Sequence, residues 1–332
     1  MKKLLIWDGD ETLWRGTFTE GVIDLPVVRR MFCEELAKRG VLQAVASYNR
    51  PEDVAGVLFQ HGLDQIFLHS QATLDRSIPK SAMVRAILDA YGLSRFTDVA
   101  FVDDDPLNLE EVHRGCPGIF SLHPRLLDQF AFDHLTKPTY TDEDRFRVAR
   151  YRSEQARKTE AAAYGGDQQA FLRSCQIKMT VGRAEKWETD SLNGLLARAH
   201  RTAAVASWFT SFNDVSLYDD VFVARVVDRF GEYGLSGFVV VADEEIAALV
   251  VSCRTQGRGV GSALLGWVIN NSFVKPGLGI VPARWTVTDY NMGVMSLYAW
   301  YGFDIKSYGK TVVAELLLKG PVTLPDWIEV VS

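Results

Sequence analysis

The chain has 332 residues, of which 47% are hydrophobic and 23% charged, and this suits a globular protein of two domains rather than one small domain. Its net charge of −6 excludes a broad electrostatic attraction to nucleic acid, although a local site can still bind an anionic ligand. No stretch approaches the roughly 20 apolar residues that a membrane-spanning helix needs, so no membrane association is expected.

Short apolar runs alternate with helical patterns over about the first 125 residues. The predicted strands are 4–7, 41–46 and 99–102, and the predicted helices are one that includes 28–36, then 51–61, 79–91 and about 106–114. Strands that alternate with helices imply parallel βαβ units. This part is therefore predicted to be a layered α/β domain whose ligands bind at the carboxyl ends of the strands.

A charged segment rich in helix formers follows this part. Residues 142–163 predict a bridging helix, which the pair Gly165 and Gly166 ends. From about Gln176 a second α/β unit is expected. The predicted organisation is a first domain over 1–140, a bridging segment over 141–175 and a second domain over 176–332.

The cysteines and the N-terminal segment favour a cytoplasmic protein. The four cysteines are scattered and form no CxxC pair, so neither a zinc site nor a disulfide framework is indicated. The apolar run 4–7 meets Asp8 at once and is too short for the core of a signal peptide.

Two carboxylates at the end of the first predicted strand give the strongest chemical signal. Asp8 and Asp10 belong to the segment Asp8-Gly9-Asp10-Glu11-Thr12. The first carboxylate can attack phosphorus and form an aspartyl phosphate, and the second can protonate the leaving oxygen and later activate water. A capped acidic turn would have the same composition, so this segment alone leaves both interpretations open.

Polar residues at the ends of later elements support the phosphoryl chemistry. Ser47 ends the second predicted strand, and Lys80 begins a helix where it can neutralise developing charge. Asp103 and Asp104 follow the third strand and offer the oxygen ligands that Mg²⁺ prefers. Taken singly, Ser47 could be a cap and Lys80 a solvated surface charge. Asp105 is expected to cap the helix that begins at Pro106.

In this order and context, the polar residues resemble the signature of the haloacid dehalogenase (HAD) superfamily. The resemblance implies a HAD-like Rossmannoid parallel sheet and a Mg²⁺-dependent phosphatase acting on a small phosphorylated molecule. The implied catalytic residues are Asp8, Asp10 and Lys80, the implied metal ligands are Asp8, Asp10, Asp103 and Asp104, and the implied phosphate-binding residues are Thr12, Ser47 and Asn49.

A glycine-rich loop characterises the second domain. The segment Gln256-Gly257-Arg258-Gly259-Val260-Gly261 lies between an apolar strand, 249–252, and an apolar helix. It resembles the pyrophosphate loop of GNAT acyltransferases, where backbone amides at a helix N-terminus hold the pyrophosphate of coenzyme A. A predicted strand over 284–288, followed by Asn291, Tyr298 and Tyr301-Gly302-Phe303, resembles later parts of the same fold.

This second resemblance implies a GNAT-like α/β domain. The implied acyl- or pantetheine-binding residues are Gln256, Gly257, Gly259, Gly261 and Asn291. It leaves open whether the domain takes coenzyme A or the phosphopantetheine arm of a carrier protein.

The whole chain from Leu4 to about Phe303 resembles the FkbH-like proteins of polyketide pathways. The resemblance rests on five segments: 7–16 (Trp-Asp-Gly-Asp-Glu-Thr-Leu-Trp-Arg-Gly), the residues around Ser47 and Asn49, 79–81 (Pro-Lys-Ser), 228–231 (Asp-Arg-Phe-Gly) with Gly234, and 252–254 (Ser-Cys-Arg). It implies transfer of a glyceryl group from 1,3-bisphosphoglycerate to an acyl carrier protein, with removal of the remaining phosphate. Such a product supplies methoxymalonyl-type extender units.

Two features of the second domain bear on this activity. Cys253 lies three residues before Gln256, and we expect either that its thiolate accepts the acyl group or that it is a small buried hydrophobic residue. The family has a polar stretch of the form RTxQxN, but here 201–206 is Arg-Thr-Ala-Ala-Val-Ala. This departure puts the glyceryl specificity in doubt. His200 beside the stretch is either a base or a solvated residue at a helix end.

Two other functions remain open at this point. One is a small-molecule phosphatase whose GNAT-like domain only binds or positions the substrate. The other is a scaffold without catalysis that docks a carrier protein, which the intact Asp8, Asp10, Lys80 and Asp103 disfavour. The tryptophans Trp208, Trp267, Trp285 and Trp300 are expected to lie in the core.

Overall fold

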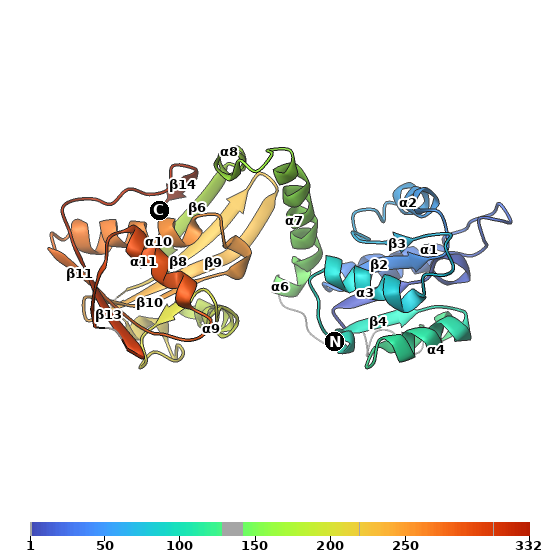
Figure 1. The fold of residues 1–332 in the computed structure, drawn as a ribbon, viewed down its shortest axis with the longest axis horizontal. Helices are drawn as coiled ribbons and strands as arrows, with labels where there is room; N and C mark the ends of the chain where they lie inside the picture. The colour runs from blue at the N-terminus through green and yellow to red at the C-terminus, as the bar shows by residue number, and fades with distance from the viewer. Residues whose placement is uncertain (1, 128–141, 219, 308) are drawn as a thin grey trace. The chain divides into compact units, whose positions relative to one another are not determined.

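The computed structural model describes residues 2–127, 142–218, 220–307 and 309–332. The chain divides into two compact units, Met1–Ala156 and Arg157–Ser332, which run from blue to green and from green to red in Figure 1. Each unit is an α/β structure and the first has a parallel sheet, as the sequence predicts. The sheet of the second unit is mixed.

The first unit is built on a five-stranded parallel sheet with the order β3-β2-β1-β4-β5. The strands are β1 (Leu4–Trp7), β2 (Leu42–Ser47), β3 (Gln71–Ala72), β4 (Val99–Val102) and β5 (Phe120–Leu122). All residues of β1, β2 and β4 are buried, as in strands that helices cover on both faces. Trp7 at the end of β1 pairs with Val45 of β2 and Val102 of β4, so the residues after these strands emerge at one edge.

Among the described residues, four helices, one after each of β1 to β4, cover the two faces of this sheet. They are α1 (Val27–Lys38), α2 (Pro51–Gln60), α3 (Lys80–Ala90) and α4 (Pro106–Gly115). Residues of α1 and α2 form one hydrophobic cluster with Leu5 and Trp7, whereas residues of α3 and α4 form another with Leu4 and Ile6 (Figure 1). The predicted cap is confirmed, because the Asp105 carboxylate accepts a hydrogen bond from the Leu107 amide.

The predicted bridging segment is helical in the part that the structure describes. It contains α6 (Asp142–Arg145) and α7 (Arg147–Ala162), and α8 (Gln168–Ser174) follows the predicted break at Gly165 and Gly166. The boundary between the two units lies inside α7. The domain bounds expected from the sequence, at 140 and 175, stay predictions.

The second unit is built on a nine-stranded mixed sheet with the order β12-β13-β11-β10-β9-β8-β6-β14, in which the short strand β7 also pairs with β10. The strands are β6 (Ile177–Arg183), β7 (Ala203–Val205), β8 (Asp220–Asp228), β9 (Gly231–Ala242), β10 (Glu245–Val251), β11 (Ile280–Thr286), β12 (Asp304–Ser307), β13 (Thr311–Leu317) and β14 (Ile328–Val331). Among the described residues, its helices include α8, given above, and α9 (Thr189–Arg198), α10 (Val260–Val268) and α11 (Met295–Trp300).

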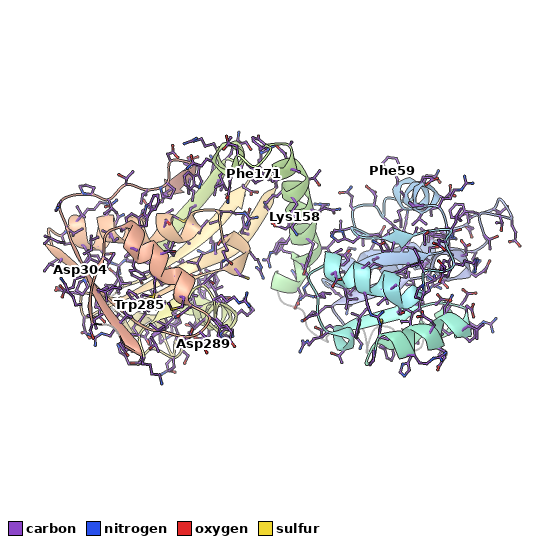
Figure 2. All side chains as sticks on the ribbon, viewed as in Figure 1. Phe59, Lys158, Phe171, Trp285, Asp289 and Asp304 are labelled. Atoms are coloured by element: carbon purple, nitrogen blue, oxygen red, sulfur yellow. The ribbon has the colours of Figure 1, made fainter. Side chains whose placement is uncertain are left out.

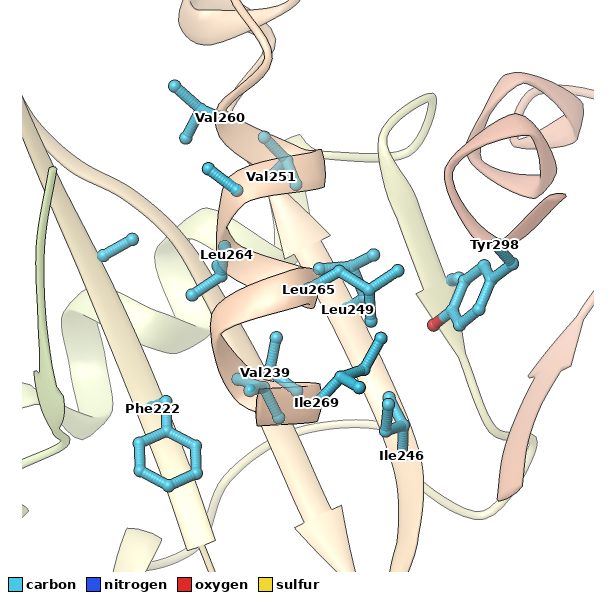
Figure 3. Packing of buried hydrophobic residues seen from close by; sticks show 14 of the residues in the cluster. Phe222, Val239, Ile246, Leu249, Val251, Val260, Leu264, Leu265, Ile269 and Tyr298 are labelled. Carbon is cyan, nitrogen blue, oxygen red and sulfur yellow. The ribbon is translucent and has the colours of Figure 1, made fainter. Parts of the chain in front are cut away.

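Helix α10 is apolar nearly all round because it packs into the core of this unit. Val260, Leu264 and Leu265 are fully buried and belong to one cluster with Leu249 and Val239 of the sheet (Figure 3). The helix follows β10 directly through the glycine-rich loop, so this core fixes where the loop lies.

The recorded pairing of β10 with β11 lies near the start of β10 and in the middle of β11. Their parallel pairing is recorded at Ile246 and Ala283, and beyond it β7 pairs antiparallel with β10 at Ala248, Leu249 and Val250. The ladder is extended by hydrogen bonds from the Val251 amide to the Thr202 carbonyl and from the Ala206 amide to the Ala247 carbonyl. Of the stretch 201–206, the residues from Thr202 to Ala206 are thus bonded to the sheet.

Two of the tryptophans expected in the core are exposed. Trp208 and Trp300 have exposed fractions of 51% and 71%, so this prediction is wrong for them. Trp208 stacks on Tyr218 at the surface, and Trp300 is the last residue of the short helix α11. Trp285, labelled in Figure 2, is buried as expected, and it stacks on Tyr298. Among the described residues, no helix is long and apolar enough to cross a membrane.

Candidate active site

Asp8, Lys80 and Asp103 meet at the carboxyl edge of the parallel sheet. Asp8 follows β1 and Asp103 follows β4, whereas Lys80 is the first residue of α3. The Lys80 ammonium donates to Asp8 Oδ1 and, at 2.5 Å, to the carbonyl oxygen of Ala46, and its Nζ lies 3.5 Å from Asp103 Oδ2. Only 1% of Lys80 is exposed, so the alternative of a solvated surface charge is wrong. A buried lysine bound to two carboxylates is placed to neutralise charge that develops between them.

The local charge balance of this group affects the protonation of Asp8. Burial raises the pKa of Asp8 to about 7, the Lys80 charge opposes this rise and the Asp103 carboxylate adds to it. Burial also raises the pKa of Asp103, against the charge of Lys80 and the hydrogen bond from Asn108. If both buried carboxylates are ionised, they carry more negative charge than one lysine compensates, and this is why their ionised forms are disfavoured without a further cation.

The same carboxylates fit a divalent metal ion. Oxygen atoms of Asp8, Asp103 and Asp104 lie within 4.8 Å of one another. Mg²⁺ prefers such hard oxygen ligands, and its charge would balance the excess of buried carboxylate. Neighbouring side chains orient two of the ligands. Thr12 Oγ1 donates to Asp104 Oδ1 at 3.2 Å, and Asn108 Nδ2 donates to Asp103 Oδ1 at 3.1 Å.

The Asp10 side chain lies outside this carboxylate group, although the sequence predicted it as a metal ligand. Its Oδ1 accepts hydrogen bonds from Trp14 Nε1 and from Asn49 Nδ2, each at 2.8 Å. Asn49 Nδ2 also donates to Ser47 Oγ at 3.0 Å. The predicted phosphate-binding residues Ser47 and Asn49 thus lie beside Asp10, whereas the hydroxyl of Thr12 is directed to Asp104.

The turn after β1 requires a glycine where the tryptophan ring closes over it. A Cβ atom on Gly9 would lie 2.5 Å from Trp14 Cζ2 and 2.8 Å from Ser47 Oγ. Trp14 is 1% exposed, and its ring packs directly against the turn that carries Asp8 and Asp10. Its indole N–H donates a hydrogen bond to the Asp10 carboxylate. The packing of Trp14 over the phosphoryl site is expected from the sequence, but its hydrogen bond to Asp10 is not. Its position four residues after Asp10 was the available signal, but the residues between them are not in a regular α-helix.

Replacing Trp14 by Phe is expected to lower kcat for phosphate release by about tenfold or more, because a hydrogen bond to a carboxylate contributes about 1.5–3 kcal/mol. The ring is kept and only the N–H is lost, so KM should change less than kcat. The measurement is steady-state phosphate release. Trp7→Phe is the matched control, since the buried Trp7 indole donates to Gln43 and not to Asp10. Equal losses of kcat in both variants would contradict the assignment.

In the second unit, the glycine-rich loop lies where the sequence predicts it, between β10 and α10. Gly257 and Gly259 have φ angles of +75° and +83°, which L-amino acids with a side chain rarely adopt. Gly259 is the residue that precedes the first turn of α10, whose first amides have no partner within the helix. Free amides at a helix N-terminus suit an anion such as a phosphate.

Cys253 is exposed just before this loop. The alternative that it is a small buried hydrophobic residue is therefore wrong, whereas Cys33, Cys116 and Cys175 are buried. His200 is exposed after the end of α9, as expected for a solvated residue at a helix end.

The Asn291 side chain makes hydrogen bonds within the protein. Its Nδ2 donates to the carbonyl oxygens of Ala203 and Thr286 at 3.0 and 2.9 Å, and its Oδ1 accepts from the Thr288 amide at 2.8 Å. Asn291 is only 4% exposed. In this structure it ties β7 to the end of β11, and its predicted contact with a pantetheine arm stays a prediction.

No family model and no curated protein matches the chain. Among solved structures, the phosphatase domain in the N-terminal part of a Bacteroides fragilis protein, complexed with Mg, is 23% identical over 36% of this chain, with a TM-score of 0.33. The match spans 35% of that chain, so this protein covers about a third of it.

Acetyltransferases also match the chain. A variant of the spermidine N-acetyltransferase SpeG from Vibrio cholerae is 16% identical over 42% of this chain and 93% of its own, with a TM-score of 0.32. The ribosomal-protein-S5-alanine acetyltransferase from Vibrio fischeri is 13% identical over 43% of this chain and 94% of its own, with a TM-score of 0.33. At these values the function has to be argued from the residues of the chain itself.

Proposed function

We propose that the first unit is a Mg²⁺-dependent phosphatase of the haloacid dehalogenase type. The observation that carries the proposal is the buried group of Lys80 with Asp8 and Asp103, beside a second carboxylate on Asp10. Bound Mg²⁺, held by Asp8, Asp103 and Asp104, would withdraw charge from the phosphoryl oxygens. The remaining chemistry belongs to side chains of the chain.

The reaction proceeds in two steps. A carboxylate oxygen of Asp8 attacks phosphorus, the bond from phosphorus to the leaving oxygen breaks, and Asp10 gives its proton to that oxygen. Asp10 then takes a proton from water, whose oxygen attacks the aspartyl phosphate and releases inorganic phosphate and Asp8. Lys80 holds Asp8 in place and compensates the negative charge that develops during both steps.

We further propose that the second unit transfers an acyl group to a phosphopantetheine thiol. Its support is the glycine-rich loop at the start of α10, the exposed Cys253 beside it, and the resemblance to FkbH-like proteins. On this proposal the chain moves a glyceryl group from 1,3-bisphosphoglycerate to an acyl carrier protein, and the first unit removes the phosphate ester. The acyl phosphate bond breaks as the thioester forms, and its phosphate leaves.

A second candidate function is supported by the stretch 201–206. Ala204 and Ala206 stand where the family has amide side chains, and they are 0% and 1% exposed within hydrophobic clusters. Methyl groups in a core offer no hydrogen bond to a glyceryl hydroxyl. This favours another acyl group, or a phosphatase whose second unit only binds the substrate.

The test is intact-protein mass spectrometry with Mg²⁺, a system that generates 1,3-bisphosphoglycerate, and a phosphopantetheinylated carrier protein. We expect a glyceryl mass on the carrier with the unaltered protein, and at least about a hundredfold less with Cys253→Ala if the thiolate accepts the acyl group. The control Cys175→Ala removes a buried thiol and should load the carrier normally. Full loading of the carrier by Cys253→Ala would show that the acyl group is transferred directly to the carrier thiol. If the carrier stays unmodified with every variant and with the unaltered protein, only the phosphatase proposal remains.

A further inference from the structure

The glycine-rich loop is held by a side chain from the far end of the chain. The carbonyl oxygen of Arg258 accepts a hydrogen bond from Trp327 Nε1 at 2.9 Å. Trp327 comes just before β14, 69 residues later in the sequence. The ring also lies against the loop backbone, since a Cβ atom on Gly259 would be 3.0 Å from Trp327 Nε1 and 3.1 Å from Cζ2.

Other carbonyl groups in and just before the loop also accept hydrogen bonds from side chains of the protein. Gly257 O accepts from Gln168 Nε2 at 3.2 Å. The carbonyl oxygens of Arg254 and Gln256 accept from Arg258 Nη1 at 2.8 and 3.4 Å. These carbonyl oxygens, which carry the negative ends of the peptide dipoles, are thus occupied by donors of the protein and do not face an anion that binds the loop amides.

The bond from Trp327 also sets the direction of the next amide. In a trans peptide the C=O and the N–H point in opposite directions, so a carbonyl of Arg258 that faces the indole turns the Gly259 N–H away from it. The amides of Val260 and Gly261, the first two residues of α10, have no intrahelical partner. Three successive amides then become available to one anion.

We infer that Trp327 is a positioning residue for phosphate binding by the glycine-rich loop, and this rests on the proposal that the second unit takes a phosphopantetheine thiol. Its indole N–H holds the Arg258 carbonyl, and the Gly259 amide is thereby presented to a phosphate group. The ligand chemistry is a phosphate ester next to a pantetheine arm, whether in coenzyme A or on a carrier protein.

The experiment compares the full chain with Trp327→Phe, which keeps an aromatic ring and removes the N–H. Dissociation constants are measured for coenzyme A, 4′-phosphopantetheine and pantetheine, by calorimetry or by ligand-observed NMR for weak binding. Loss of one neutral hydrogen bond is expected to raise the dissociation constant of coenzyme A by about fivefold. The dissociation constant of pantetheine, which has no phosphate, should not change. Trp187→Phe is the matched control because this tryptophan is 76% exposed.

Each outcome decides something different. If only the binding of coenzyme A is weakened, the loop holds the pyrophosphate. If the binding of 4′-phosphopantetheine is weakened equally, the loop needs only a single phosphate. Either outcome supports the inference. Unchanged binding of both phosphorylated ligands to Trp327→Phe would overturn the inference while the proposed function stands. An equal loss of affinity for pantetheine would also overturn the inference, because the effect of the ring would then be on packing and not on phosphate binding. If the unaltered protein binds none of the three, the proposed function of this unit fails, and the inference with it.

Discussion

Replacing Asp8 by Asn is expected to lower kcat for phosphate release by at least about a thousandfold, because the amide is a poor nucleophile toward phosphorus. The change is nearly isosteric, and the oxygen of the new amide can still accept a hydrogen bond from Lys80, so the fold should be kept. In the carrier-loading assay, this variant should give a carrier with a phosphoglyceryl mass in place of a glyceryl mass. Mass spectrometry and phosphate release together check both results.

Asp105→Asn is the matched control for this prediction. Asp105 lies two residues after Asp103 and caps α4, and Asn caps a helix about as well as Asp. We therefore expect nearly unaltered phosphate release from this variant. Residual activity of Asp8→Asn near that of the control would show that Asp8 is not the nucleophile.

Replacing Asp228 by Asn is expected to lower the free energy of unfolding of the second unit by about 3–5 kcal/mol at pH 7, because it removes the buried carboxylate charge that the Arg157 guanidinium binds through two hydrogen bonds. The Arg157 guanidinium from α7 donates to both oxygens of Asp228, at 2.7 and 2.8 Å, and the Tyr233 hydroxyl donates to Oδ2 at 2.7 Å. Both side chains of the ion pair are at most 5% exposed. Urea unfolding followed by tryptophan fluorescence measures the effect.

The effect of this substitution should depend on pH. Burial alone would raise the pKa of Asp228, but the hydrogen bonds from Arg157 and Tyr233 and the guanidinium charge outweigh it and hold the pKa below its usual value. A carboxylate whose pKa is lower in the folded state stabilises the fold above the unfolded pKa of about 4, and this contribution is lost as the pH falls through the folded pKa. The difference between the protein and Asp228→Asn should therefore be full at pH 7 and 5 and shrink below about pH 4.

An exposed ion pair in the same unit provides the control. Arg173 and Asp326 lie 2.9 Å apart with 53% and 65% of their side chains exposed. Asp326→Asn is expected to change the unfolding free energy by less than about 1 kcal/mol. A loss as small as this for Asp228→Asn would mean that the buried pair contributes little to stability.

The elements predicted best are those that are buried on both faces. Strands β1 and β4 begin and end at the predicted residues, because a central parallel strand is a continuous apolar run that ends at a polar residue. Strand β3, with two residues, and β7, with three, were not predicted. Such short strands form through pairing with a neighbour and have no periodicity of their own.

For the phosphoryl site, the positions of residues along the chain predict which residues come together but not how each side chain is oriented. Asp8, Lys80 and Asp103 come together as expected because each stands at the end of a predicted strand or the start of a predicted helix. The orientation of Asp10 could not be predicted, since it depends on Trp14 and Asn49 across an irregular turn. The hydrogen bond between Trp327 and Arg258 could not be predicted either, because these residues are 69 positions apart and approach each other only when the sheet of the second unit has formed.

The short strand β7 limits what the second unit can accept. From Ala247 to Val251, one side of β10 is bonded to residues 202–206, and Asn291 fastens this strand at Ala203. An extended guest, whether a peptide or the amide-containing part of a pantetheine arm, therefore has no open main chain to align with along this stretch. If the unit acts on a phosphopantetheine thiol as proposed, recognition would come from the start of α10 and from side chains, and we expect it to depend on the phosphate more than on the backbone amides of the arm.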